Sequence, residues 1–234
     1  MSLSPSILRS MFPSAGVRLN DHLPYIEPAM SMGSIVTPKR VSSFCAQVGH
    51  ESNDFLWMEE IASGDEYDTR TDLGNTPEID GDGAWFKGHG PIQITGKANH
   101  AAVGRYLGIN TIENPKLLTL PQYGTASAVW FWTIGNKKCN LNALADLDWF
   151  LTMTRVINGG LNGLRDRLDR WERNRRLFEL EIYDRNKLTL IEDEKIRIFQ
   201  RANGLNDDGA VGNITLAKIR EVYARDNGMC NGDR

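Results

Sequence analysis

A long segment rich in Gly, Asp, Asn and Thr, residues 63–96, interrupts a chain whose remaining pattern is mostly helical. Turn signals run through this segment, which leaves room for short strands at most. A loop region of this length inside a compact domain is uncommon unless it has a function. The sequence therefore predicts a mainly α fold with one functional Gly-rich loop/short-strand region.

Helical signals stand on both sides of the loop region. Ser4-Pro5 and Thr37-Pro38 each combine an N-cap residue with proline at the first helical position. The segment 164–182 places Leu, Trp and Phe near helical spacing, with Arg, Asp and Glu between them. We expect an amphipathic helix there, with its charged side chains facing solvent.

Length and net charge limit the number of domains and the kinds of partner that the chain can have. Its 234 residues suit one full domain plus a small one, or a single large domain. The net charge of −3 gives no general affinity for nucleic acid. No apolar run is long enough to cross a membrane, so we expect no membrane insertion. The N-terminus lacks a convincing signal peptide, which indicates folding in a cytoplasm.

The cysteines and histidines give no pattern typical of a metal site. Cys45, Cys139 and Cys230 are odd in number and widely spaced, which predicts reduced structural cysteines. His50 and His89 have no third ligand at a suitable spacing. We therefore expect no metal and no cofactor.

The stretch "GHESNDFLWMEE" places carboxylates beside apolar side chains. On a helix that begins at Thr37, the residues Val41, Phe44 and Val48 form one stripe, and Glu51 lies at its edge. Half-burial there would disfavour the charged form of the carboxylate, as a general acid requires. The alternative is a structural Glu whose oxygens accept bonds from neighbouring donors.

Glycoside hydrolysis needs a second carboxylate, and inverting enzymes hold the two carboxyls roughly 6.5–9.5 Å apart. One straight helix would separate Glu51 and Glu60 by about 13 Å along its axis, on opposite faces. The chain must therefore bend, and residues 52–54 are a plausible place. Spacing alone leaves open which residue is the base, and the candidates are Glu59, Glu60 and Glu66.

The loop "GDGAWFKGHGPIQIT" supplies the remaining parts of a sugar site. Its glycines permit tight turns and the close approach of a ligand. Trp85 and Phe86 offer flat apolar faces that suit sugar rings. On an extended segment, Gln93 and Thr95 would point to the same face and could hold a water and a sugar hydroxyl. The alternative is a Gly-rich structural loop with an ordinary Gln and Thr.

Three blocks, "GHES", "FKGHGPIQITGKANH" and "RVINGGLNGLRDRL", resemble the ordered signatures of family 19 glycoside hydrolases, the plant-type chitinases and their phage endolysin relatives. Their order and spacing, with "EEIASG" and "TRTDLGNT", are most similar to the endolysin branch. The resemblance covers roughly residues 3–182. It implies a helical, lysozyme-like bilobal domain and an inverting reaction that uses no metal.

The resemblance also assigns roles to residues of this chain. It implies that Glu51 is the general acid, that Glu60 is the second carboxylate and that Thr95 helps to hold the nucleophilic water. The positions that match substrate-contacting or cleft-lining groups are Gln93, Asn99, Asn158 and Arg167. The chain departs from the family pattern at Asn53-Asp54 and at His89, beside the implied cleft. These departures bear on substrate preference more than on chemistry.

A boundary near residues 183–187 predicts a catalytic domain over 1–185 and a small helical C-terminal unit over 186–234. The pattern "FQRANGL…DGAVGNITLAKI" resembles the second half of a small peptidoglycan-binding domain. That resemblance implies binding to the cell wall. The alternative is a relic that packs on the catalytic domain.

These features predict a monomeric phage endolysin that cleaves β-1,4 bonds in the glycan strands of peptidoglycan. We expect it in the host cytoplasm before lysis and on the cell wall after a holin releases it. One alternative is a chitinase that acts on β-1,4-linked N-acetylglucosamine polymers. Another is a catalytically inactive wall-binding or structural protein.

Overall fold

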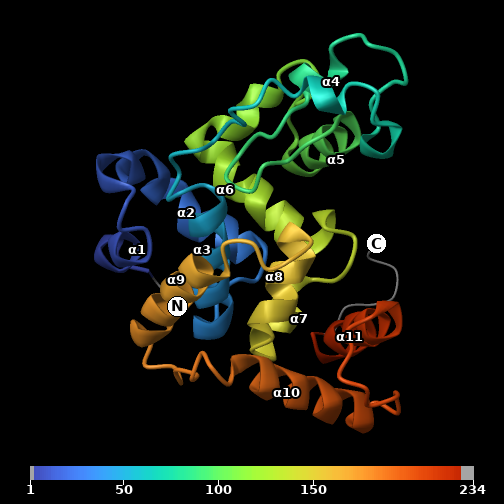
Figure 1. Ribbon diagram of the computed structural model, residues 1–234. Helices are drawn as coiled ribbons and strands as arrows, with labels where there is room; N and C mark the ends of the chain where they lie inside the picture. Colours follow the sequence, from blue (N-terminus) through green and yellow to red (C-terminus); the bar gives the residue numbers. More distant parts are fainter. Residues whose placement is uncertain (1–2, 228–234) are drawn as a thin grey trace.

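The computed structural model describes residues 3–227 and is mainly helical, as predicted (Figure 1). Among these residues, β-type pairing is limited to isolated bridges at Glu59, His89 and Ile94. The helices are α1 (Pro5–Met11), α2 (Leu19–Met32), α3 (Pro38–Glu51), α4 (Asp82–Trp85), α5 (Lys97–Leu107), α6 (Pro121–Trp130), α7 (Leu141–Asp146), α8 (Phe150–Asn158), α9 (Leu164–Arg176), α10 (Leu188–Ala202) and α11 (Asn213–Asp226).

The chain forms two lobes (Figure 1). One holds the short helices α4 and α5 with the long loops around them, and the other holds α1, α3, α7, α8 and α9. Helix α6 runs from the first lobe into the second and continues as a π-helical turn, η5 (Phe131–Gly135). No described helix is long and apolar enough to span a bilayer.

Helix α3 is the central helix of the larger lobe. Thr37 accepts a hydrogen bond from the backbone N–H of Arg40 at 3.4 Å, and Pro38 is the first helical residue. The predicted stripe of Val41, Phe44 and Val48 is buried. Helices α9 and α7 cover α3, so its axis is fixed by packing along most of its length.

The predicted bend follows directly after Glu51. Asn53, Asp54 and Phe55 have φ of 46°, 55° and 62°, which is the left-handed region. The Ser52 hydroxyl accepts from the N–H of Phe55 at 2.9 Å. Asp54 is fully buried, accepts from the N–H of Ser14 at 2.8 Å and pairs with an arginine of α9. These bonds offset the strain of three successive left-handed residues.

Close backbone approaches hold the loop region together without strands. A Cβ at Gly83 would lie 2.5 Å from both the N of Asp68 and the O of Gly64. The Asp68 carboxylate accepts from the N–H groups of Gly83 at 2.7 Å and Gly81 at 3.3 Å. A glycine at position 83 is therefore needed for this part of the loop to close.

The prediction that the charges of α9 face solvent is wrong for Arg167, Arg170 and Arg175, which are buried. Each guanidinium has a carboxylate partner on a segment far away in the sequence. Those partners are Glu51, Asp54 and Asp148.

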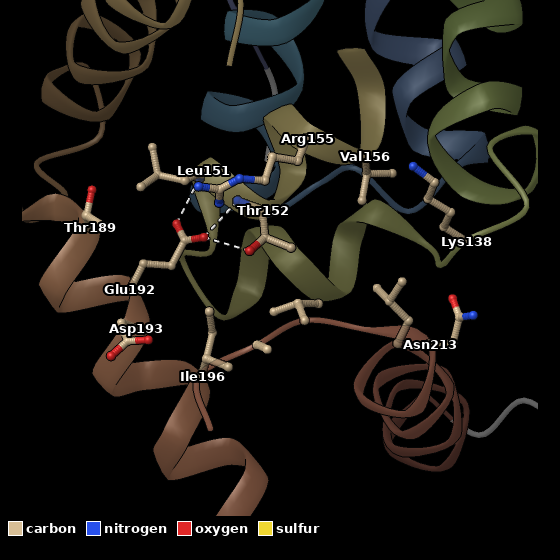
Figure 2. Close-up of a pocket in the computed structure, with 14 residues that line it drawn as sticks. Lys138, Leu151, Thr152, Arg155, Val156, Thr189, Glu192, Asp193, Ile196 and Asn213 are labelled. Carbon is tan, nitrogen blue, oxygen red and sulfur yellow. Dashed lines mark hydrogen bonds between the residues drawn. The ribbon is translucent and has the colours of Figure 1, made fainter. Parts of the chain in front are cut away.

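The C-terminal helices pack on the larger lobe through a buried carboxylate. Glu192 of α10 accepts from the N–H of Leu151 at 2.8 Å and from both the N–H and the hydroxyl of Thr152 at 2.7 Å (Figure 2). It thereby satisfies N–H groups in the first turn of α8. Burial raises the pKa of Glu192. Tyr223 of α11 is buried against Arg40, 5.6 Å from its guanidinium.

A cavity of about 500 Å³ lies where α8 meets the C-terminal helices (Figure 2). Leu151, Val156 and Ile196 are among its lining residues. The described part of the C-terminal unit thus shares an interface with the larger lobe. Cys45 and Cys139 are buried and free, and Cys230 lies outside the described residues, as does the end of the predicted unit 186–234.

Candidate active site

The carboxylate of Glu51 is fixed by a buried arginine. Arg167 Nη2 donates to Glu51 Oε1 at 2.5 Å, and Arg167 Nη1 donates to Gln47 Oε1 at 2.5 Å. The Arg167 side chain is 0% exposed and the Glu51 side chain 19%. The predicted half-burial of Glu51 is confirmed, but the group meets a cation as well as apolar neighbours. Its orientation is set by α9, across the interface from α3.

Arg167 also reaches the loop that follows α8. Its Nε donates to the carbonyl of Asn162 at 3.1 Å. Asn158, the last residue of α8, is exposed, and Gly159 ends the helix with φ 78°. The structure therefore brings Arg167 and Glu51 together, whereas within residues 3–227 no hydrogen bond joins the Asn158 side chain to either of them.

A second network supports the bend behind Glu51. His50 Nδ1 and Arg170 Nε both lie 2.7 Å from Asp166 Oδ2. Arg170 also pairs with the buried Asp54. Sequence reasoning missed these supporting residues, although Asp54 stands where the family pattern differs. The Asp-for-Gly departure thus serves an ion pair that anchors the bend.

Of the three candidates for the base, Glu60 has the environment that suits the role. Neutral donors hold its carboxylate: the Tyr67 hydroxyl lies 2.8 Å from Oε1 and the Gly88 N–H 2.8 Å from Oε2. Among the described residues, no Lys, Arg or His forms an ion pair with it. A general base must accept a proton, which a carboxylate without a fixed cation does more readily.

The neighbouring carboxylates suit the role less well. Glu59 pairs with Lys87 at 3.0 Å and with Lys116 at 3.2 Å. Burial opposes the charge on Glu59, but the bonds from these lysines outweigh it and lower its pKa. Glu66 is exposed in the short helix η2 (Asp65–Tyr67). We therefore favour Glu60 as the base.

The prediction of an extended segment at Gln93 is wrong. Gln93 has φ 54°, and its N–H donates to the carbonyl of Gly90 at 3.1 Å, which closes a turn. The Thr95 hydroxyl donates to the Gln93 carbonyl at 3.0 Å, and the Asn99 amide donates to the Thr95 carbonyl at 2.8 Å. Thr95 and Asn99 thus shape the turn, and the Thr95 oxygen keeps lone pairs for a water.

Gly88 brings the turn and the candidate base together. A Cβ at this position would lie 2.5 Å from Gln93 Oε1 and 3.2 Å from Glu60 Oε2. The absence of a side chain therefore lets the amide of Gln93 approach the Glu60 carboxylate. Glu60 and Gln93 thus approach each other at Gly88, and Thr95 is joined to Gln93 by the hydrogen bond from its hydroxyl.

The prediction that Trp85 and Phe86 both offer flat faces to a sugar holds for only one of them. Trp85 is 51% exposed, but Phe86 is 2% exposed and packs on His100, so Phe86 offers no face to a sugar. Trp57 is 45% exposed, and its carbonyl lies 3.4 Å from the Gln93 amide. Trp57 was missed because residues after a bend have no periodicity that predicts exposure. Its exposed indole is a flat apolar face of the kind that suits a sugar ring.

The residues that could hold a metal are engaged elsewhere. His50 contacts Asp166, and His89 Nδ1 lies 3.2 Å from His100 Nε2 inside the smaller lobe. Within residues 3–227, no three His, Cys, Asp or Glu side chains gather as metal ligands would. The arrangement is suited to acid–base chemistry by carboxylates.

Comparison with known proteins identifies the family of the chain. Residues 31–149 match the glycoside hydrolase family 19 model described as chitinase class I. A glycosyl hydrolase family 19 domain-containing protein of Haemophilus influenzae is 30% identical over 71% of this chain and 92% of its own length. An endochitinase of Arabidopsis thaliana is 38% identical over 56% of the chain, which spans 43% of that relative's length.

The structure is also similar to a solved one. Chitinase C from Streptomyces griseus HUT6037 has a TM-score of 0.58 and 25% identity, over 76% of each chain. This match confirms the helical, lysozyme-like fold that the resemblance implies. The matches in sequence and structure agree, and the chain belongs to glycoside hydrolase family 19.

Proposed function

We propose that the protein hydrolyses β-1,4 glycosidic bonds in the glycan strands of bacterial peptidoglycan by an inverting acid–base mechanism. One observation carries this proposal: two carboxylates stand in contrasting environments. Glu51 is fixed by the buried cation of Arg167, and Glu60 is held by neutral donors on the loop region. Because a fixed cation favours the charged form of a carboxylate, Arg167 suits Glu51 to bear the negative charge that remains once it has donated its proton, whereas neutral donors leave Glu60 able to take a proton from water.

In this mechanism, Glu51 donates its proton to the glycosidic oxygen as the bond to the anomeric carbon breaks. Negative charge then develops on Glu51, where the fixed guanidinium of Arg167 stabilises it. Glu60 takes a proton from the water that attacks the opposite face of the sugar, and Thr95 accepts a hydrogen bond from the same water. Inversion at the anomeric carbon follows, with no covalent intermediate.

Two features support peptidoglycan as the substrate. The order and spacing of the motifs, including "EEIASG" and "TRTDLGNT", resemble the endolysin branch of the family. The C-terminal unit resembles part of a peptidoglycan-binding domain. We infer from them a phage endolysin that acts as a monomer, accumulates in the host cytoplasm and reaches the wall after holin-mediated release.

A chitinase is the second candidate, and the relatives favour it. The Arabidopsis relative and the Streptomyces structure are both named as chitinases. Purified protein should be assayed on permeabilised Gram-negative cells and on colloidal chitin, with Glu51→Gln as the inactive control. Loss of turbidity with cells alone supports the endolysin, and sugar release from chitin alone supports the chitinase. Activity on neither supports a catalytically inactive protein.

We further propose that the C-terminal unit contributes to wall binding. Its helices expose Leu190, Ile198 and Ile214 at 72%, 53% and 75%. Truncation at Arg185 would also remove the buried Glu192, so substitution in the full chain is the cleaner test. Leu190→Ser and Ile214→Ser should weaken pull-down on purified sacculi. Binding equal to that of the unmodified protein would show that these surfaces do not contact the wall.

A further inference from the structure

The candidate base is held at both of its oxygens. Tyr67 Oη donates to Glu60 Oε1 at 2.8 Å, and the N–H of Gly88 donates to Oε2 at 2.8 Å. The backbone N–H of Glu60 donates to the Gly88 carbonyl at 2.8 Å, which fixes the main chain as well. Tyr67 is therefore the one side chain among the described residues that donates a hydrogen bond to this carboxylate.

The backbone of Tyr67 is itself fixed. Its N–H donates to the carbonyl of Gly64 at 2.9 Å, and its own carbonyl accepts from the Asn75 side chain at 2.7 Å. Asn75 Oδ1 in turn accepts from the N–H of Lys97, at the start of α5, at 3.0 Å. A phenol on a loop is thus tied to a helix of the same lobe, as positioning requires.

The surroundings of Tyr67 determine which group is the donor in its hydrogen bond with Glu60. The hydrogen bond to Glu60, together with burial, raises the pKa of Tyr67 to about 12. The charge of Glu66 acts in the same direction. The phenol therefore stays protonated at neutral pH and acts as the donor, and Glu60 is the acceptor. Lys87 Nζ donates to the backbone carbonyl of Glu60 at 3.0 Å and pairs with the Glu59 carboxylate, so it forms no ion pair with the Glu60 side chain.

We propose that Tyr67 is a positioning residue that orients the Glu60 carboxylate and keeps it in the charged form that accepts a proton from water. This inference rests on the proposed function, because it gives Tyr67 a role only if Glu60 is the base. The segment between Gly64 and Asn75 then has a function, because it places the Tyr67 hydroxyl beside the Glu60 carboxylate.

Tyr67→Phe in the full-length protein tests the proposal, because Phe keeps the ring and removes the donor. A hydrogen bond to a charged group affects a rate by about ten- to a hundredfold, so kcat should fall by that factor. KM should stay within about twofold, since Tyr67 acts on the base and not on the sugar. The acid limb of the pH–rate profile should move to higher pH, since Glu60 loses a donor to its charged form.

Tyr106→Phe is the matched control. Tyr106 lies on α5, is 37% exposed, and its hydroxyl makes no hydrogen bond to any described residue. Its loss should leave kcat and the pH profile unchanged. Tyr67→His, which keeps a ring N–H, should retain more activity than Tyr67→Phe. The comparison of Tyr67→His with Tyr67→Phe remains informative if both variants are less stable than the unmodified protein.

Two backgrounds separate failure of this inference from failure of the proposed function. In Glu60→Gln, adding Tyr67→Phe should cause no further loss, because Tyr67 then has no base to orient. Normal turnover by Glu60→Gln would overturn the assignment of the base and the role of Tyr67 with it. An inactive Glu60→Gln beside a Tyr67→Phe with unchanged kcat and pH profile would overturn this inference alone.

Discussion

Replacing Arg167 by Met should destabilise the protein strongly, because it leaves the Glu51 carboxylate and the Gln47 amide without their buried partner. Removing one partner of a buried ion pair costs about 3–5 kcal/mol. Glu51 keeps 19% exposure and can regain some hydration, which favours the lower end, about 3 kcal/mol. For a protein of this size, that corresponds to a fall in Tm of about 6–12 °C.

Urea unfolding and thermal denaturation followed by circular dichroism would measure this change. Arg165→Met is the matched control, because Arg165 lies exposed on the same helix. The Glu51→Gln/Arg167→Met double variant should lose less stability than the sum of the single variants, since both changes remove the same interaction. A loss below about 1 kcal/mol for Arg167→Met, or additive losses, would refute the argument that the pair is coupled.

Three further predictions follow from the smaller lobe. Burial lowers the pKa of both His89 and His100 to about 4. Their contribution to stability is therefore complete above about pH 6.5 and should be lost as the pH falls toward 4, because the unfolded imidazoles bind protons first. Tm measured from pH 7 to pH 4 should show this decline, and His100→Gln should reduce its slope. Glu60→Ala should lose at least a hundredfold in kcat, whereas Glu59→Ala should lose less than about tenfold; the reverse order would make Glu59 the base. Gly88→Ala should lower kcat about tenfold or more, because the added Cβ displaces the Gln93 amide, and unchanged kcat would show that this close approach is dispensable.

Local signals in the sequence predicted the larger lobe well. Thr37-Pro38 predicted where α3 begins, and the apolar stripe predicted which of its faces is buried. The geometric objection to one straight helix between Glu51 and Glu60 correctly required a bend. Capping, periodicity and helix length are properties of neighbouring residues, so a single sequence contains them.

The ion pairs of α9 could not be predicted in the same way. Its arginines follow the spacing of a solvated face, and 116 positions separate Arg167 from Glu51. Whether such a charge is buried depends on a partner that only the folded chain brings near. The sequence could not decide between Glu59 and Glu60 as the base for the same reason. The choice depends on Lys87 and Lys116, which lie beyond the bend.

The loop region was predicted as functional but not in its detail. Phe86 points into the smaller lobe, whereas Trp57 and Trp85 stay exposed. An irregular segment has no periodicity from which buried side chains could be told apart from exposed ones. Gln93 adopts a left-handed conformation that few residues other than Gly, Asn and Asp favour. Its turn is stabilised by hydrogen bonds to Gly90, which sequence alone does not reveal.

The central claim, that Glu51 and Glu60 act as acid and base on either side of the scissile bond, is tested most directly by the anomer that is released first. An NMR time course should follow cleavage of a soluble β-1,4-linked oligosaccharide, with Glu51→Gln as the blank. Attack by a water held at Glu60 and Thr95 predicts that the α-anomer appears first and converts slowly to the equilibrium mixture. Initial release of the β-anomer would mean retention through a covalent intermediate, and would contradict the roles assigned to both carboxylates.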